Sequence, residues 1–193
     1  MPRKNQSNPL ICNRKLAKSS STITKYMNQQ PDKYQQLAED CAKLLAQNHK
    51  KVAFAESATA GFLMACFSCC KHSEVLSGGI VCYDAAIKTS LLGVDQAVID
   101  VYTAESIPVT EGIAKGLSNL INSDYYIGIT GLLKPGGSET VDKPVGTMYV
   151  TIYEKDDKLT HKYIFSGSPE NIRNECLARI CMLLIEKITL SVL

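Results

Sequence analysis

The spacing of apolar residues divides this 193-residue chain into strand-like and helix-like segments. Short apolar runs predict strands at residues 51–55, 78–83 and 125–130. Apolar residues three or four positions apart predict helices at residues 32–48, 59–70, 85–92, 106–121 and 169–188. Two further runs, 146–153 and 159–165, flank a short polar turn and predict a hairpin. Strands that alternate with helices in this way predict an α/β fold with parallel strands.

Polar side chains lie at or just after the ends of the first three predicted strands. Ser57 follows the first strand, Tyr83 ends the second, Lys88 lies in the helix after it, and Thr130 ends the third. Because the carboxyl ends of parallel strands share one edge of a sheet, we expect these four side chains to gather there.

A glycine-rich loop leaves the third predicted strand at the same edge. It runs from Gly131 through Pro135-Gly136-Gly137-Ser138 to Lys143. Glycine tolerates positive φ and leaves its amide accessible, so successive N–H groups in such a loop can bind an anion. The loop therefore favours a phosphorylated small molecule as the partner, although an ordinary long connection is the alternative.

Positive charges concentrate at the start of the chain. The formal net charge is +2, yet six Lys or Arg residues and no acidic residue precede Met27. The rest carries 15 basic and 19 acidic residues, so we expect no nucleic-acid-binding surface on the folded body. Residues 1–30 are predicted to be a basic disordered extension and residues 31–193 the folded domain. An upstream start codon, a basic arm and a transit-like leader are competing explanations of the extension.

Neither a membrane segment nor a metal site is expected. No apolar run approaches the roughly 20 residues that cross a bilayer. Cys66, Cys69 and Cys70 are spaced almost as zinc ligands are, but no second Cys or His pair stands at a matching interval. We expect the eight cysteines to pack mainly in the core, with no cofactor, in a protein of the reducing cytoplasm.

Five separated motifs resemble the CinA C-terminal domain family in their order and approximate spacing. They are Glu56-Ser57-Ala58-Thr59-Ala60-Gly61, Gly78-Gly79-Ile80-Val81-Cys82-Tyr83 with Lys88, Leu91-Leu92-Gly93-Val94, Ile129-Thr130-Gly131 and Lys143-Pro144-Val145-Gly146-Thr147. The likeness covers about residues 32–190. It implies a three-layer α/β/α sandwich with a mixed, mostly parallel sheet of about five strands, in the stand-alone form of the family.

The family includes amidohydrolases that convert nicotinamide mononucleotide (NMN) to nicotinate mononucleotide and ammonia. The resemblance therefore implies this activity here. The substrate-binding residues that it implies are Glu56, Thr59, Thr130, Gly131, Pro135, Gly136, Gly137, Ser138 and Arg173. Arg173 would clamp the phosphate with its guanidinium group.

Hydrolysis of an amide by a serine needs a base, and the resemblance points to Lys88 with Tyr83 as a hydrogen-bonding partner. The nucleophile is open between two serines. The family pattern slightly favours Ser73, but a six-residue strand of roughly 20 Å separates Ser73 from Lys88. Ser73 would have to fold back or come from a neighbouring subunit of a homo-oligomer, whereas Ser57 already lies at the expected edge.

A second interpretation is a nucleotide-binding protein with altered or lost catalysis. The family has Cys and Gly where this chain has Ala58 and Ala60, and an Ala-Gly pair where it has Leu133 and Lys134. The larger side chains could narrow the site, or Lys134 could contact a phosphate. A DNA-associated partner protein is the third interpretation, and the charge of the folded body gives it little support.

Overall fold

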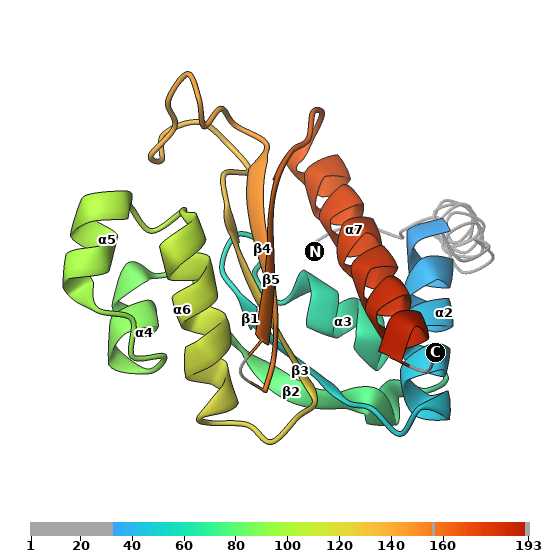
Figure 1. The fold of residues 1–193 in the computed structure, drawn as a ribbon. Coiled ribbons are helices and arrows are strands. Elements are labelled where there is room, and N and C mark those ends of the chain that lie inside the picture. Colours follow the sequence, from blue (N-terminus) through green and yellow to red (C-terminus); the bar gives the residue numbers. More distant parts are fainter. Residues whose placement is uncertain (1–32, 156, 192–193) are drawn as a thin grey trace, which may run out of the picture. The chain divides into compact units, whose positions relative to one another are not determined.

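A five-stranded mixed sheet forms the middle layer of the fold in a computed structural model that describes residues 33–155 and 157–191 (Figure 1). Its strands, in spatial order, are β2 (Leu76–Val81), β1 (Val52–Glu56), β3 (Tyr125–Gly131), β4 (Thr147–Glu154) and β5 (Asp157–Ile164). The predicted basic extension, residues 1–30, lies outside the described residues.

The first three strands of the chain are parallel, as the alternating pattern predicts. β1 pairs in parallel with both β2 and β3, and Glu56 stands beside Val81 on one side and Ile129 on the other. β4 is antiparallel to β3 and to β5, so four of the five strands run in one direction. The carboxyl ends of β1, β2 and β3 consequently share one edge of the sheet.

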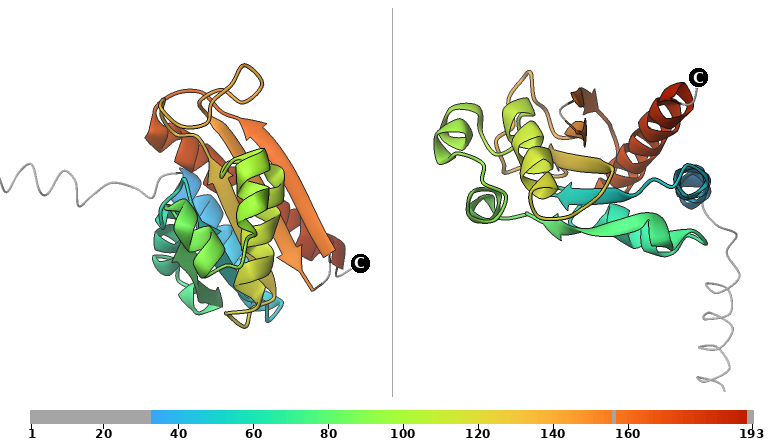
Figure 2. Two further views of the ribbon diagram at one scale, coloured as in Figure 1. Left: turned by 90° about the vertical axis from the view of Figure 1, so that its left-hand side faces the viewer. Right: turned by 60° about the horizontal axis from the view of Figure 1, so that its bottom comes forward.

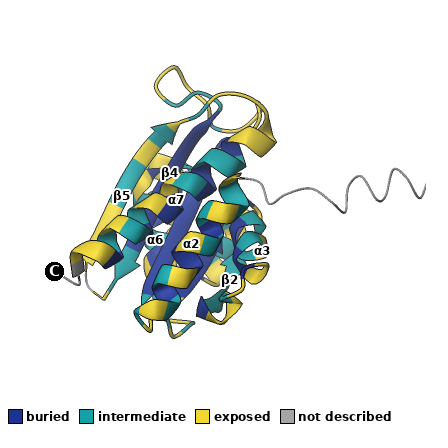
Figure 3. Cartoon of the chain, turned by 90° about the vertical axis from the view of Figure 1, so that its right-hand side faces the viewer, coloured by how far each residue is buried: buried dark blue, intermediate teal, exposed yellow. Residues whose placement is uncertain are grey.

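Helices cover both faces of the sheet. One face carries α2 (Lys33–Gln47), α3 (Phe62–Ser68) and α7 (Pro169–Ser191), and the other carries α4 (Ala85–Ser90), α5 (Gln96–Tyr102) and α6 (Ile107–Ser118) (Figures 1 and 2). Figure 3 shows the outer sides of α2 and α7 exposed and the strands behind them buried. This arrangement confirms the three-layer α/β/α sandwich.

Each face of the sheet has its own apolar core. Phe54 and Ile127 pack on the side of α2, α3 and α7, whereas Ala53 and Ala55 of the same β1 strand pack against residues of α6. Because alternate side chains of β1 enter opposite cores, all five of its residues are buried. A strand buried on both faces is rigid, which gives the residues that follow it a fixed position.

Three local features differ from the sequence-based expectation. Helix α5 was not predicted, α3 begins at Phe62 rather than near Thr59, and β2 begins at Leu76, two residues before the predicted start. A short 3₁₀ helix, η1 (Ser73–Val75), leads into β2.

Candidate functional site

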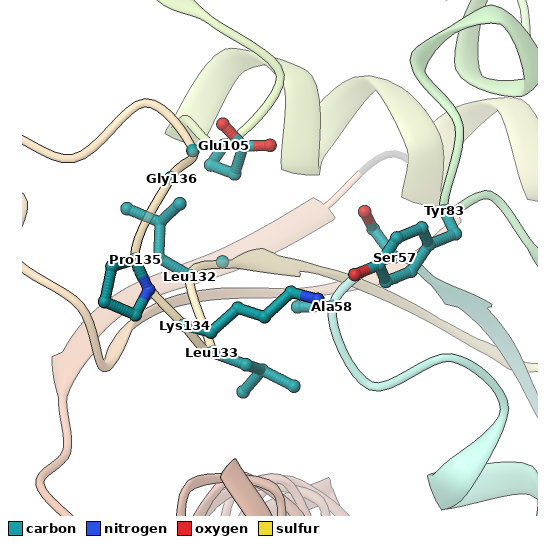
Figure 4. A pocket seen from close by; sticks show the side chains of 11 residues that line it. Ser57, Ala58, Tyr83, Glu105, Leu132, Leu133, Lys134, Pro135 and Gly136 are labelled. Atoms are coloured by element: carbon teal, nitrogen blue, oxygen red, sulfur yellow. The ribbon is translucent and has the colours of Figure 1, made fainter.

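A pocket lies at the shared carboxyl edge of the three parallel strands and has a volume of about 180 Å³ (Figure 4). Four segments contribute to it: the β1–α3 turn, the β2–α4 connection, Glu105 in the segment between α5 and α6, and the loop after β3. Its lining residues are Ser57, Ala58, Tyr83, Glu105, Gly131, Leu132, Leu133, Lys134, Pro135, Gly136 and Gly137. The structure thus brings together Ser57, Tyr83 and the glycine-rich loop, which the sequence predicted to meet at one edge.

Ser57 is held at the rim by the backbone of the sheet. Its amide donates to the carbonyl of Ile129 (2.9 Å), which extends the pairing of β1 with β3 by one residue beyond the strand. Its side chain is buried to 95% yet lines the pocket, and among the described residues its hydroxyl makes no hydrogen bond. The hydroxyl of Ser57 is therefore free to face a ligand.

Glu56 closes the start of α3 and does not line the pocket. Its fully buried carboxylate accepts hydrogen bonds from the amides of Gly61 (2.9 Å), Leu63 (3.2 Å) and Met64 (2.8 Å). These are amides of the first helical turn, which would otherwise lack acceptors. The geometry gives Glu56, predicted to bind substrate, the role of a helix cap.

The turn between Ser57 and α3 contains Ala58 and Ala60, two of the four positions where the sequence predicted a narrowed or altered site. Ala60 has φ +52°, in the left-handed region that favours glycine, so its β-carbon adds strain of about 1–2 kcal/mol. Thr59, predicted to bind substrate, is fully buried, and its Oγ1 has no hydrogen-bond partner among the described residues.

Lys88, on α4, is buried with 1% of its surface exposed, and it does not line the pocket. Its Nζ donates to the carbonyl of Cys82 (2.9 Å), while the amide of Cys82 donates to the carbonyl of Glu56 (2.8 Å). Two hydrogen bonds thus link Lys88 to the residue before Ser57. Burial lowers the pKa of Lys88, and the negative charges of Glu105 and Asp84 partly oppose that shift.

Tyr83 projects into the pocket from the β2–α4 connection. It is 61% exposed, unlike the buried Lys88 five residues later. Figure 4 shows its side chain beside Ser57 in this view, and Lys134 extends from the opposite loop toward Ala58. A ligand in the pocket would therefore meet the hydroxyls of Ser57 and Tyr83, which follow β1 and β2, and the ammonium of Lys134 from the loop.

The glycine-rich loop forms the predicted anion-binding turn, but the loop's own carboxylate occupies it. The amides of Gly136 and Gly137 donate to the two oxygens of Glu139, at 2.7 Å and 2.8 Å. Gly136 has φ +97°, which only glycine adopts readily. The hydrogen bond from Gly136 is the main cause that lowers the pKa of Glu139, so this carboxylate stays ionised at neutral pH.

A second polar network anchors the same loop to the segment before α6. Lys143 Nζ donates to Ser138 Oγ (2.7 Å), Thr103 Oγ1 (2.7 Å) and the carbonyl of Glu105 (3.2 Å). Ser138, predicted to bind substrate, donates to the carboxylate of Glu105. Burial lowers the pKa of Lys143, and Glu105 opposes this.

Three residues of this region had no assigned role in the sequence-based prediction: Glu105, Glu139 and Lys143. Lys143 entered only as part of a motif. An acidic residue two positions after a Gly-Gly pair could have signalled a carboxylate that closes its own turn. Glu105 carries no such signal, because a contact 38 residues along the chain fixes its position.

Two other predicted binding residues lie outside the pocket lining. Thr130 is fully buried and shares a 2.6 Å hydrogen bond with Thr110 of α6, whose hydroxyl donates to the carbonyl of Ser106 (2.7 Å). Thr130 therefore ties β3 to α6. Arg173 packs over Phe62, with 5.0 Å between its Cζ and the ring centroid, and its buried Nε has no partner among the described residues.

Ser73 lies at the far edge of the sheet from the pocket. It is exposed and begins the 3₁₀ helix that precedes β2, whereas Lys88 follows the carboxyl end of β2. The six residues of β2 span roughly 20 Å, so Ser73 and Lys88 do not meet within one chain.

The remaining expectations concern metals, thiols and membranes. Residues 33–155 and 157–191 contain no group of three His, Cys, Asp or Glu side chains arranged to hold a metal ion. The seven cysteines in this part of the chain form no disulfide, and all but Cys66 and Cys69 are buried. No helix in the same residues is both long and apolar enough to cross a bilayer.

Comparison with known proteins identifies the family. The model of the CinA C-terminal domain matches residues 34–188. The chain belongs to the CinA C-terminal domain family. A CinA-like protein of Thermotoga neapolitana is 34% identical over 140 residues, which are 72% of this chain and 34% of that protein. One from Sulfurihydrogenibium is 35% identical over 139 residues, with the same coverage. The chain thus spans about a third of the length of these curated relatives.

Solved structures of the CinA superfamily share the fold. The competence damage-inducible protein A (ComA) of Klebsiella pneumoniae superposes with a TM-score of 0.77 at 23% identity, over 82% of this chain and 98% of that one. The competence/damage inducible protein CihA of Agrobacterium tumefaciens superposes with a TM-score of 0.76 at 22% identity. This match covers 82% of this chain and 98% of the CihA chain. These matches cover nearly all of each solved chain, so the shared fold makes up almost the whole of those chains.

Proposed function

We propose that this protein is an amidohydrolase that converts NMN to nicotinate mononucleotide and ammonia. The observation that carries the proposal is the pocket at the carboxyl edge, where an unbonded serine hydroxyl, a tyrosine and a glycine-rich loop meet. A buried lysine is linked by two hydrogen bonds to the residue before that serine. Nucleophile, base and anion-binding loop are the parts that hydrolysis of a phosphorylated amide requires. Membership of the CinA family supports the assignment.

Ser57 is the nucleophile in this proposal. Its Oγ attacks the carboxamide carbon of NMN, the amide nitrogen leaves as ammonia, and a nicotinoyl ester forms on Ser57. Water then cleaves the ester, which releases nicotinate mononucleotide and restores the hydroxyl. Ser57 is preferred to Ser73 because it lines the pocket, whereas Ser73 lies beyond the opposite end of β2.

Lys88 accepts the proton of Ser57 and passes it to the departing nitrogen. A lysine can act as a base only when its amine is neutral, and burial shifts Lys88 in that direction. The pyridinium cation of NMN would favour the neutral amine further. Tyr83, exposed beside Ser57, can donate a hydrogen bond to the substrate or relay the proton.

The phosphate binds at the loop from Lys134 to Ser138 in this proposal. The loop offers the Lys134 ammonium and the amides of Gly136 and Gly137, which a phosphate would have to take from Glu139. Arg173 is the alternative phosphate ligand, since its Nε has no partner among the described residues.

Incubation of the full-length protein with NMN tests this function. We expect ammonia and nicotinate mononucleotide in equal amounts, and a loss of roughly 10²–10⁴-fold or more in turnover for Ser57→Ala and for Lys88→Met. Both variants should still bind NMN. Binding by the wild-type protein without ammonia release would instead support the nucleotide-binding interpretation, for which the strained Ala60 is the supporting observation.

A further inference from the structure

Glu105 gives the pocket a negative charge, and we propose that it selects substrates with a positively charged ring. This inference rests on the proposed function and concerns the same pocket. Glu105 would contact the pyridinium of the nucleotide, so that NMN binds better than an equally shaped nucleotide with a neutral ring.

Glu105 faces the ligand space directly. It lies between α5 and α6, is half-buried, and lines the pocket together with Ser57 and Tyr83 (Figure 4). One of its carboxylate oxygens, Oε2, accepts the hydroxyl proton of Ser138. The other, Oε1, has no hydrogen-bond partner in the part of the chain that the structure describes. One oxygen is therefore fixed by the protein and the other remains available to a ligand.

The hydrogen-bond network uses the carboxylate of Glu105 as an acceptor. Lys143 Nζ donates to Ser138 Oγ (2.7 Å), so the single proton of Ser138 is left for an acceptor, and Glu105 supplies that acceptor. The carboxylate thus accepts the proton of Ser138 and donates no hydrogen bond in return. The same lysine also binds the backbone carbonyl of Glu105 (3.2 Å), which fixes the main chain beneath the side chain.

The charge of Glu105 is not cancelled by an ion pair. Within residues 33–155 and 157–191 no Lys or Arg nitrogen lies within 4.0 Å of its carboxylate oxygens. Lys143 directs its protons to two hydroxyls and one backbone carbonyl, and Lys88 directs its Nζ to Cys82. An incoming cation would therefore be the first positively charged group in direct contact with this carboxylate.

The pocket carries opposite charges on separate segments. Lys134 comes from the glycine-rich loop and Glu105 from the segment before α6. A ligand with a cationic ring and an anionic phosphate complements both, whereas a ligand that is only anionic would be repelled by Glu105. NMN has both charges, and the reduced mononucleotide has the same phosphate and carboxamide on an uncharged dihydropyridine ring.

Binding of this pair of nucleotides tests the inference. Dissociation constants would be measured by calorimetry in a full-length Ser57→Ala protein, which cannot turn NMN over in the proposed mechanism. We expect Glu105→Gln to weaken NMN binding about tenfold and reduced NMN binding less than about twofold. Gln keeps an oxygen acceptor for Ser138, so the loop stays anchored. Glu105→Asp, which keeps the charge, should keep the preference for NMN.

Glu111→Gln is the matched control, because Glu111 pairs with Lys158 of β5, does not line the pocket and should change neither constant. Equal losses for both nucleotides in Glu105→Gln, or no loss, would overturn the inference and leave the proposed function standing. Failure of the Ser57→Ala protein to bind either nucleotide would overturn both. A melting temperature close to that of Glu111→Gln would show that the Glu105→Gln protein is folded.

Discussion

Lys88 shows how one buried side chain can acquire reactivity from its position. An ammonium at 1% exposure has lost almost all of its hydration, and its one hydrogen bond goes to a neutral carbonyl rather than to a carboxylate. Burial is the largest influence on its pKa and favours the neutral amine. The negative charges of Glu105 and Asp84 oppose this shift of the pKa and favour the ammonium, but burial has the larger effect.

The pH dependence of turnover follows from that shift. Only the neutral amine of Lys88 can accept the Ser57 proton, so kcat/KM should rise with pH and level off above the pKa of Lys88. Because burial lowers this pKa, the midpoint of the rise should lie below about pH 10.4, the pKa of an ordinary lysine. The profile would be measured between about pH 6 and 10 with NMN.

Two variants sharpen the same measurement. Lys88→Arg should be inactive throughout the range, since a guanidinium group stays protonated. Glu105→Gln removes a negative charge that favours the ammonium, so the rise should move to lower pH. Retained turnover in Lys88→Arg, or a profile that does not respond to pH, would remove Lys88 from the role of base.

At the scale of elements, the loop between β3 and β4 has a structure of its own before any ligand arrives. The amides of Gly136 and Gly137 hold Glu139, and Lys143 ties Ser138 to the segment before α6. A phosphate that binds these amides has to displace the carboxylate. The affinity for phosphate is then lower than the bare loop would give, by the free energy of the two internal hydrogen bonds.

Removal of this internal anion should therefore tighten phosphate binding. In Glu139→Gln the uncharged side chain is the weaker partner for the two amides, and we expect NMN to bind several-fold more tightly, a change of about 1 kcal/mol. Asp142→Asn is the control, because it removes the same charge from the same loop, and its side chain binds neither amide. Equal effects of the two variants would indicate general electrostatic repulsion, and no effect would locate the phosphate elsewhere.

The loop also illustrates what a sequence can and cannot predict. Gly136 and Gly137 predicted the turn correctly, because glycine is the residue that permits φ +97°. The occupant of the turn depends on where the Glu139 side chain points, which the pattern of residue types does not specify. Glu105 enters the pocket through contacts between segments far apart in the sequence, so it had no local signal.

The secondary structure, too, was predicted correctly where the local sequence signal was strong. The long helices α2 and α7 and the buried strands β1 and β3 had strong periodic patterns and were predicted within a few residues. Helix α5 was missed because it has only seven residues and contains Val98, Ile99 and Val101, whose branched side chains favour strands. A sequence signal for the start of α5 was nevertheless present, because Asp95 is its N-cap. The side chain of Asp95 accepts a hydrogen bond from the amide of Ala97 (2.9 Å).

On the scale of the whole molecule, the parallel strands separate the two serines. Ser57 follows the carboxyl end of β1, and Ser73 precedes the amino end of the neighbouring β2. Because the two strands are parallel and adjacent, the serines lie at opposite edges of one sheet. Ser73 can give its proton to Lys88 only if a second copy of the chain brings Ser73 to that edge. The identity of the nucleophile therefore depends on whether the protein forms an oligomer.

Activity of the two serine variants, alone and mixed, decides this question. We expect Ser73→Ala to keep NMN hydrolysis near the wild-type rate and Ser57→Ala to lose it, because only Ser57 lies in the pocket of its own chain. Mixing Ser73→Ala with the inactive Lys88→Met protein under conditions of subunit exchange should then give only the activity of the Ser73→Ala portion. An inactive Ser73→Ala protein that recovers activity in this mixture would mean that a neighbouring subunit supplies the nucleophile, since a mixed oligomer can hold one intact shared site. An inactive Ser73→Ala protein without recovery would contradict the separation of about 20 Å along β2, because Ser73 would then have to act within its own chain.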